Sequence, residues 1–536
     1  MKGATGATLL ALFACGPAPT TSPQPRDDLT ALEQRYQRAR YWDDQERLLQ
    51  SRGTDSSVQG VSHAVIHESL TVARADLGRL LRAAPISDPR NQAAFDAIRT
   101  AWDQGLSGDS AAAEAGGDAM PLARLTDSMM KIYGAATGGI VVDADTLDRL
   151  AILGLLARTD DRDRRERLFR ALVPVWHSIN GDDGPTSPYR RLLALRRSAW
   201  GDSASPIERK APAFGLTTPE LERWLVDALG RWRASLPDTL YEPWDWYYLM
   251  GFASRRLSPR VPAPDDIRRV DEAYYRSLGA DPVRLGVHYD LIARTGKYPV
   301  AFTDFGVRNR WRDGQLVPGE PWVFASYLEG GLDNLAELVH ETGHAIHIAA
   351  IDTRPAFIDW PDNDTFTEAL ADLPAMEVYE PAWQARFLGD SAPLGQSLRA
   401  KYAGIVFDMA WALFEIRVHR DPGADPNLVW ITITRDFLRI RPHPELSWWA
   451  MRGQLVDSPG YLINYALGAF IVADLRQSVR RVRGPSAWSD PGLYAWLSNH
   501  LYRFGLERPS REVLEQFLGR PLQAAPLLDD LARIAR

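Results

Sequence analysis

Two histidines four residues apart, with a glutamate directly after the first, form the pattern in this sequence that most clearly suggests chemistry. His340, Glu341 and His344 give the pattern H-E-x-x-H within residues 334–350, which read NLAELVHETGHAIHIAA. Residues four apart share one face of an α-helix, so the two imidazoles can bind a single Zn²⁺. The Glu341 carboxylate beside them is then a candidate general base that takes a proton from water, rather than a metal ligand. The alternative is a structural pair of histidines on a helix.

A catalytic zinc site needs a third protein ligand and one open position for water. Glu368 is the candidate, because it follows the two histidines within residues 364–377, a second helical pattern. We therefore expect one Zn²⁺ per chain, bound by His340, His344 and Glu368. Asp372, one turn after Glu368, could accept the free ring N–H of a ligand histidine. The alternative for Glu368 is an acidic residue favoured by the helix dipole near a helix N-terminus.

The elements that must hold these residues can be predicted from the same stretch. Apolar residues at helical spacing, with no Pro among them, predict a helix over residues 334–350. Before it, residues 321–327 (PWVFASY) form a short apolar run bounded by Pro and Gly, which predicts a strand. An extended substrate could pair its backbone with this strand along the edge of a sheet.

Composition and charge limit the class of protein. The chain has 536 residues, 45% of them hydrophobic, which is ample for a large core. A net charge of −7, with Lys and Arg dispersed, argues against nucleic acid as the main partner. An apolar period typical of helices recurs over residues 27–236 and predicts an N-terminal helical region, followed by a catalytic region over residues 237–536. The 18 Trp are expected in the core or along a groove.

The first residues resemble a targeting segment rather than part of the fold. Residues 1–14 have a basic start and a short apolar run, and LFAC at residues 12–15 resembles the lipobox of bacterial lipoproteins, which are lipidated at the Cys after signal cleavage. Residues 15–26 are rich in Pro, Thr and Ser, which predicts a tether. We therefore expect a protein of the bacterial cell envelope, anchored only by a lipid on Cys15, on the periplasmic or extracellular face. An ordinary secretory signal with an incidental Cys is the alternative.

Several segments, in order along the chain, resemble one group of zinc peptidases. Residues 242–248 (EPWDWYY) resemble the PWD-x-x-YY segment of the thimet oligopeptidase and oligopeptidase A group, and residues 290–297 (DLIARTGK) resemble a stretch of that group and of oligoendopeptidase F. The segments HETGHAIH at residues 340–347, FTEA at residues 366–369 and PGYLINYALG at residues 459–468 fit oligoendopeptidase F.

This resemblance implies a mainly α-helical, two-lobed gluzincin peptidase with a deep channel and a small β-strand unit next to the H-E-x-x-H helix. It also implies hydrolysis of peptide bonds in short unstructured peptides, with Tyr465 and Tyr461 stabilising the oxyanion. Two core tyrosines one turn apart on a helix are the alternative. His347 is not a metal ligand in the family, so we expect it to pack near the site. His63 and His67 have no Glu between them and are expected on a solvated helix face.

One departure from the family concerns a histidine that usually precedes the tyrosines. Residues 451–458 (MRGQLVDS) contain none. Arg452 or Gln454 could donate a hydrogen bond in its place, and His443 is a more distant candidate. If none of them does so, either fewer hydrogen-bond donors stabilise the transition state than in the family, or the substrate differs from the family's substrates.

Two other functions remain open. The same metal ligands serve relatives of carboxypeptidase Taq and angiotensin-converting enzyme, which trim peptides from the C-terminus. A cationic side chain placed to hold the substrate carboxylate would favour that activity. The protein could instead be an envelope lipoprotein that binds peptides without cleaving them. Glu341 argues against this second function, because a pure binder has no use for a general base.

Overall fold

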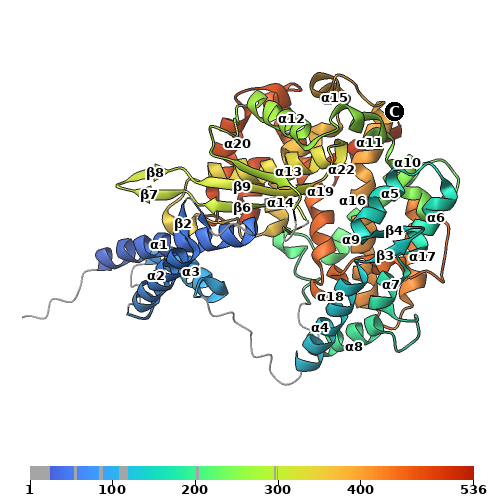
Figure 1. The fold of residues 1–536 in the computed structure, drawn as a ribbon, viewed down its shortest axis with the longest axis horizontal. Coiled ribbons are helices and arrows are strands. Elements are labelled where there is room, and N and C mark those ends of the chain that lie inside the picture. The colour runs from blue at the N-terminus through green and yellow to red at the C-terminus, as the bar shows by residue number, and fades with distance from the viewer. Residues whose placement is uncertain are drawn as a thin grey trace, which may run out of the picture.

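The computed structural model describes residues 25–53, 57–58, 60–83, 89–107, 119–200, 205–294, 297–298 and 300–535. The predicted signal peptide, Cys15 and the tether up to residue 24 lie outside this part of the chain. Within it, no helix is both long enough and apolar enough to span a membrane. The described part is mainly helical, as predicted, and its largest sheet has only three strands (Figure 1).

Helices precede and follow the sheet. The helices before it are α1 (Pro25–Arg52), α2 (His63–Ala83), α3 (Pro89–Ala101), α4 (Ala119–Ala136), α5 (Arg149–Arg158), α6 (Arg162–Arg170), α7 (Val173–Asn180), α8 (Pro188–Trp200), α9 (Thr218–Ala234), α10 (Trp246–Met250), α11 (Phe252–Leu257) and α12 (Pro264–Ser277). The helices after it are α13 (Leu332–Ala350), α14 (Asp364–Ala375), α15 (Pro381–Leu388), α16 (Leu394–Arg420), α17 (Pro426–Leu438), α18 (Gln454–Asp457), α19 (Tyr461–Arg483), α20 (Leu493–His500), α21 (Ser510–Leu518) and α22 (Ala525–Ala532).

The sheet has three strands, β5 (His288–Ile292), β9 (Glu320–Tyr327) and β6 (Phe302–Val307), in the order β5-β9-β6. β5 runs parallel to β9, and β6 runs antiparallel to it, with Thr303 opposite Val323. The remaining strands form three small hairpins: β1 (Ser57–Val58) with β2 (Val61–Ser62), β3 (Ile140–Val142) with β4 (Asp145–Leu147), and β7 (Arg310–Arg312) with β8 (Gln315–Val317).

The strand predicted over residues 321–327 is confirmed as β9, but its predicted role at a sheet edge is wrong. β9 is the middle strand, so both of its edges are already paired, with β5 and with β6. Its nearly continuous apolar sequence fits this central position. The edge strand beside the H-E-x-x-H helix is β6, whose sequence FTDFGV gave no strong strand pattern.

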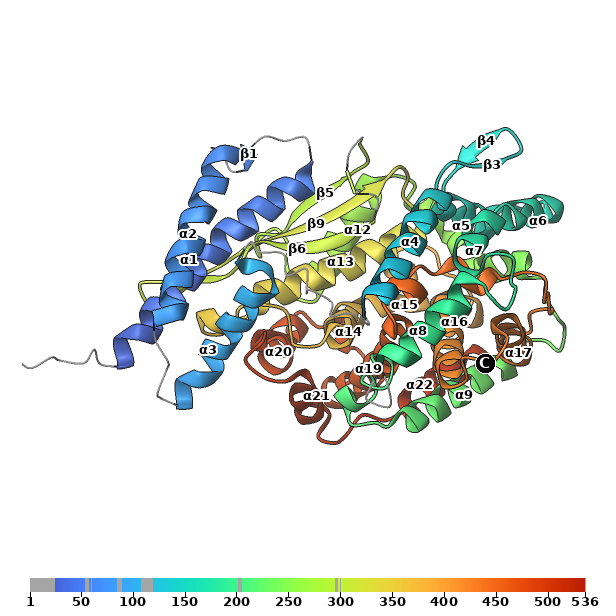
Figure 2. The ribbon, with the colours of Figure 1, turned by 90° about the horizontal axis from the view of Figure 1, so that it is seen from below.

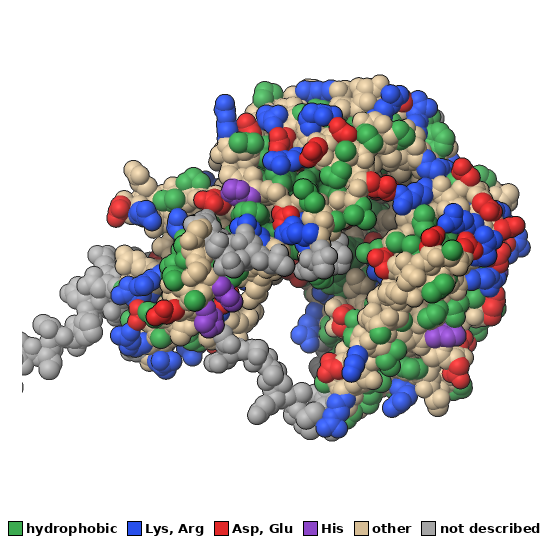
Figure 3. Space-filling view, viewed as in Figure 1, with side chains coloured by type: hydrophobic (Ala, Val, Ile, Leu, Met, Phe, Trp, Pro, Cys, Tyr) green, Lys and Arg blue, Asp and Glu red, His purple; other side chains and the backbone are tan. Residues whose placement is uncertain are grey.

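The helices pack in two groups around a hollow. α1–α3 lie on the left in Figure 1, and α4–α9 lie on the right. The space-filling view is hollowed between them (Figure 3), and β6, α14 and α19 border this hollow in Figure 1. One hydrophobic core runs from Met129 in α4 to Ile534 near the C-terminus, whereas α1, α2 and α3 share a smaller core with Ala356 and Phe357. The predicted division of the chain at residue 236 stays a prediction.

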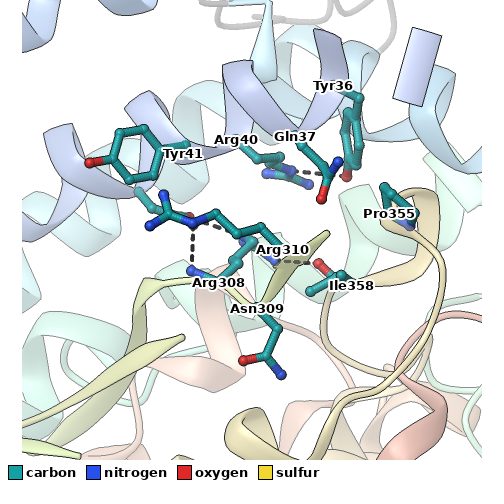
Figure 4. A pocket seen from close by; sticks show the side chains of 10 residues that line it. Tyr36, Gln37, Arg40, Tyr41, Arg308, Asn309, Arg310, Pro355 and Ile358 are labelled. Atoms are coloured by element: carbon teal, nitrogen blue, oxygen red, sulfur yellow. Dashed lines mark hydrogen bonds and ion pairs between the residues drawn. The ribbon is translucent and has the colours of Figure 1, made fainter. Parts of the chain in front are cut away.

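α1 is fastened to the end of β6 by buried charges. Arg308, directly after β6, pairs with Asp44 of α1 at 3.1 Å and with Asp359 at 2.8 Å, and it donates to the Ile358 carbonyl at 3.0 Å (Figure 4). Arg40 of α1 also pairs with Asp359, at 2.7 Å. Burial raises the pKa of Asp359, but the guanidinium groups of Arg308 and Arg40 outweigh this effect and lower it to about 2. The network therefore fixes β6 relative to the first three helices.

The two helices predicted around the metal site are confirmed. The helix expected over residues 334–350 is α13, and Figure 2 shows it crossing the middle of the molecule. It packs against β6 and β9 on one side and against α14 on another. The helix expected over residues 364–377 is α14, which ends at Ala375 and continues as a 3₁₀ turn, Met376–Tyr379. Many Trp lie in the core, as expected, and seven are almost fully buried: Trp176, Trp232, Trp246, Trp411, Trp430, Trp448 and Trp449.

Candidate active site

The start of α13 is locked in place by a close approach of two backbones. The N–H groups of Gly330 and Gly331 donate to the carbonyls of Pro262 and Val261, each at 2.8 Å. A side chain at Gly330 would lie only 2.0 Å from the Val261 carbonyl oxygen. Gly331 has a φ of 111°, a conformation that residues with a Cβ rarely adopt. The glycine pair thus sets the direction in which α13 presents the H-E-x-x-H pattern.

The three predicted metal ligands come together in the structure. His340 and His344 approach each other at 3.1 Å between their Nε2 atoms, and Glu368 Oε2 lies 3.3 Å from His340 Nε2. Glu368 Oε1 lies 3.7 Å from His344 Nε2. A tetrahedral zinc with bonds of 2.0–2.2 Å separates its ligand atoms by about 3.3–3.6 Å. The spacing and the two-nitrogen, one-carboxylate donor set both fit zinc.

The site also contains the carboxylate that was predicted to orient a ligand histidine. Asp372 Oδ1 lies 2.8 Å from His340 Nδ1, the ring nitrogen that does not face Glu368. Burial lowers the pKa of His340, but Asp372 and Glu368 outweigh it and raise the pKa well above its usual value. The environment therefore favours positive charge at this ring, whether a proton or a metal ion supplies it.

Glu368 reaches the histidines because α13 and α14 touch. Its helix begins at Asn363, whose side chain caps the backbone N–H of Phe366. A Cβ at Gly343 would lie 2.6 Å from the carbonyl oxygen of Ala371, so only glycine permits this contact without movement. Burial raises the pKa of Glu368, but hydrogen bonds with the two histidines lower it well below its usual range. Glu368 is therefore a carboxylate at neutral pH, as a metal ligand must be.

Glu341, the candidate base, is held by a residue that the sequence did not reveal. The Thr303 hydroxyl on β6 lies 2.7 Å from Glu341 Oε2 and 2.8 Å from the Glu341 backbone carbonyl. The Glu341 side chain is buried at the cleft wall. Thr303 therefore holds the Glu341 side chain in place. It follows the DLIARTGK segment closely, and this proximity was its only signal in the sequence.

That segment has a structural role in leading the chain to β6. The Lys297 ammonium, only 2% exposed at its side chain, binds Asp290 Oδ1 at 2.9 Å and the Asp290 carbonyl at 2.7 Å. It also donates to the carbonyl of Ala325 in β9. Arg294 pairs with Asp290 from the other side, at 2.6 Å. The charged residues of the segment thus close the loop between β5 and β6.

The three candidate ligands His340, His344 and Glu368, called the metal group below, line a cleft of about 610 Å³. Its walls come from the segment before β6, from β6 itself and from α13, α14 and α19, and they include both predicted tyrosines. The rings of Tyr461 and Tyr465 meet edge to face with centroids 5.2 Å apart. Burial raises the pKa of Tyr465, so its hydroxyl stays a proton donor at neutral pH. Ile463, at the position of the family's middle tyrosine, is fully buried in the core.

A buried carboxylate fixes the start of α19. The N–H of Gly460, one residue before Tyr461, donates to Glu415 Oε1 at 2.7 Å. Glu415 is completely buried, and burial raises its pKa to about 7 even though Gly460 and Arg196 act to lower it. Its other oxygen has no hydrogen-bond partner within the described residues.

None of the three residues suggested in place of the family's histidine lines the cleft. Arg452 is paired with Asp408 and lies over the Trp411 ring. His443 lies 2.7 Å from Glu242, against Trp244. Gln454 opens the short helix α18 and is likewise outside the cleft.

The other histidines lie where they were expected. His347 is buried between the rings of Trp360 and Tyr502 and is a packing residue. His67 is exposed, and its Nδ1 lies 2.9 Å from Glu46 Oε1. His67 is therefore on a solvated helix face, as expected for the His63 and His67 pair.

The comparisons with known proteins concern the fold. No protein-family model and no curated protein sequence matches the chain. Among solved structures, metallocarboxypeptidase 1 of Trypanosoma cruzi is similar, with a TM-score of 0.56, 15% identity, and 95% of this chain and 99% of that chain covered. A structure of an oligoendopeptidase F is similar with a TM-score of 0.57, 15% identity and 96% of each chain covered. At this identity the similarity shows the fold alone, which is mainly helical and two-lobed as predicted, like the folds of these two structures.

Proposed function

We propose, on the premise of this gluzincin-type fold, that the protein is a zinc metallopeptidase that hydrolyses peptide bonds inside short unstructured peptides. The observation that carries the proposal is the grouping of His340, His344 and Glu368 at the wall of one cleft, with Glu341 held beside them. A pure binding protein has no need of a buried carboxylate placed as a base next to three metal ligands.

The roles of the residues follow from their positions. Zinc, when bound, would polarise the scissile carbonyl and lower the pKa of a nearby water. The Glu341 carboxylate takes a proton from that water and then delivers it to the leaving amine. Thr303 keeps the carboxylate aimed at the cleft. The Tyr465 and Tyr461 hydroxyls donate hydrogen bonds to the oxyanion that develops on the carbonyl.

The backbone of the substrate has a strand to pair with. Residues 300–303, at the start of the edge strand β6, line the cleft. A peptide that adds to this edge gains main-chain hydrogen bonds, which give affinity with little dependence on sequence. The peptide must be extended for this pairing, so folded proteins are poor substrates.

The charge of the cleft supports internal cleavage over C-terminal trimming. A carboxypeptidase needs a cation to hold the terminal carboxylate of its substrate. Among the described residues, no Lys or Arg lines the cleft, whereas Glu337 and Asp364 line it in addition to the carboxylates of the metal group. This charge would repel a substrate carboxylate close to the scissile bond.

The test uses protein lacking residues 1–15, loaded with zinc and incubated with unstructured peptides that carry either a free or an amidated C-terminus. Mass spectrometry is expected to find internal cuts in both sets, and Glu341→Gln is expected to make none. Stepwise loss of C-terminal residues only from the peptides with a free C-terminus would indicate that the protein is a carboxypeptidase instead. No cleavage by the wild type in either set would refute the proposal.

The proposal includes attachment to the bacterial cell envelope through a lipid on Cys15. Growth of cells with a labelled fatty acid is expected to label the full chain, whereas Cys15→Ser is expected to stay unlabelled. Equal labelling of the two proteins, or none of either, would contradict the anchor without affecting the peptidase proposal.

A further inference from the structure

Asn464 is a polar side chain of the cleft wall that neither the sequence pattern nor the proposed function uses. It lies on α19 between Tyr461 and Tyr465, and it is only 7% exposed although it lines the cleft. The side chain lies at the surface of the cleft, and its amide is not among the buried side-chain groups that lack a partner. Its two N–H groups can therefore donate to a substrate that enters the cleft.

The position of Asn464 on its helix places it on the same cleft-facing side as the two tyrosines. Residues three, four and seven apart share a helix face, and Tyr461, Asn464, Tyr465 and Gly468 all line the cleft. At Gly468 this face meets α14, since a Cβ there would lie 3.9 Å from Thr365. Asn464 is one turn from Gly468 on this face, so it is near the place where α19 meets α14, the helix that carries Glu368.

The two threonine hydroxyls of the wall are engaged elsewhere. Thr303 donates to Glu341, and the Thr367 hydroxyl donates to the backbone carbonyl of Asn363 at 3.3 Å. Arg452 and His443 are paired elsewhere. The chain lacks the family's histidine donor, and Asn464 presents two N–H donors on the tyrosine face itself.

We propose that Asn464 is a catalytic residue whose side-chain N–H donates to the oxyanion of the scissile carbonyl, alongside Tyr465. This inference rests on the proposed function and adds a donor to it. A neutral amide has no charge to lose with pH, so this donor works over the whole range in which Glu341 is a carboxylate. No proton leaves Asn464, because the hydrogen bond only stabilises charge that develops on the substrate.

The test compares Asn464→Ala and the isosteric Asn464→Asp with the full zinc-loaded wild type. Gln477→Ala removes an exposed amide from the same helix and serves as the matched control. Loss of one oxyanion donor lowers kcat by about 100-fold or more. We expect such a fall in both Asn464 variants with KM changed less than about twofold, and wild-type kcat in Gln477→Ala.

A second readout does not need turnover. A phosphinic peptide mimics the tetrahedral geometry, and its Kd by calorimetry is expected to weaken in Asn464→Ala by about the factor lost from kcat, while the Kd of a product peptide stays unchanged. Zinc content and melting temperature are measured on each variant. If Asn464→Ala unfolds, Asn464→Asp, which keeps the shape of the side chain, replaces it in the comparison.

Wild-type kcat in the folded Asn464 variants, or a rise in KM alone, would overturn the inference. A wild type that cleaves nothing would refute the proposed function instead. In that case the binding of the phosphinic peptide decides the inference. Equal Kd values of this peptide for the wild type and for Asn464→Ala would overturn it.

Discussion

Replacing Gly343 with Ala places a methyl group where α13 and α14 touch. The new Cβ would lie 2.6 Å from the Ala371 carbonyl oxygen and 2.9 Å from its Cα, distances that real Cβ atoms essentially never show. Both contacts are with backbone, so no side chain can rotate away. The shorter distance must grow to at least 3.4 Å, the start of ordinary contact, and the two helices must part to allow it.

This separation acts directly on the metal group. Glu368 is on α14, and the two histidines are on α13, at 3.3 and 3.7 Å from its oxygens. Metal sites tolerate deviations of only about 0.2 Å in each bond. We therefore expect zinc affinity to fall by about 10-fold or more, similar to the loss when a group that orients a ligand is removed. Overpacking costs about 1–3 kcal/mol of stability, and the better helix propensity of Ala offsets up to about 1 kcal/mol of it.

The assay is competition for zinc between the protein and a chelating dye. Gly404→Ala is the matched control, because Gly404 lies on the exposed face of α16 and a methyl group added there would have no other atom within 4 Å. The control is expected to keep wild-type zinc affinity and to gain slightly in stability. Wild-type zinc affinity in Gly343→Ala would refute the reasoning that this contact holds Glu368 against the histidines.

Three further predictions follow from single contacts. Asp372→Asn is expected to weaken zinc binding by about 10- to 100-fold, because a neutral amide supports the His340 ring less than a carboxylate does; unchanged affinity in the dye assay would contradict this. Thr303→Val is expected to lower kcat by about 10-fold or more with zinc content unchanged, and Thr303→Ser is expected to restore it, because the hydroxyl holds Glu341; equal kcat in Val and Ser variants would argue against this role. Glu415 has a folded-state pKa of about 7 against 4.5, so its stabilising contribution is complete below pH 4.5 and is lost as pH rises through 7. The free energy of unfolding of the wild type is therefore expected to fall by roughly 3 kcal/mol relative to Glu415→Gln between pH 4.5 and pH 8.5, and parallel pH profiles would contradict it.

The sequence was most informative where chemistry and local periodicity coincide. The spacing of His340 and His344 on an apolar helix predicted a shared face, and the structure has their Nε2 atoms 3.1 Å apart. Glu368 was identified because a catalytic zinc needs a third ligand and because FTEA at residues 366–369 resembles oligoendopeptidase F, and Asp372 was identified because it follows one turn later. Both contact His340. The spacing of residues along one helix is a property that a sequence expresses directly.

Features that depend on contacts between distant segments were not predictable in the same way. β9 was identified as a strand, but its place between β5 and β6 depends on pairings that no local pattern encodes. Thr303 was missed because β6 is short and has Thr, Asp and Gly among its six residues. Asn464 was passed over because the tyrosines on either side matched a family pattern. Only the packing of α19 in the fold shows that this residue lines the cleft.

The most direct test of the account is the rate of internal peptide cleavage by Glu341→Gln compared with wild type, at equal and measured zinc content. The variant keeps the shape of the side chain and leaves all three metal ligands in place. We predict one zinc per chain in both proteins and a loss of cleavage in the variant of at least about 1000-fold, since the base is removed while the metal remains. Cleavage by the variant at the wild-type rate, with zinc bound in both, would contradict the assignment of Glu341 as the base and with it the proposed mechanism.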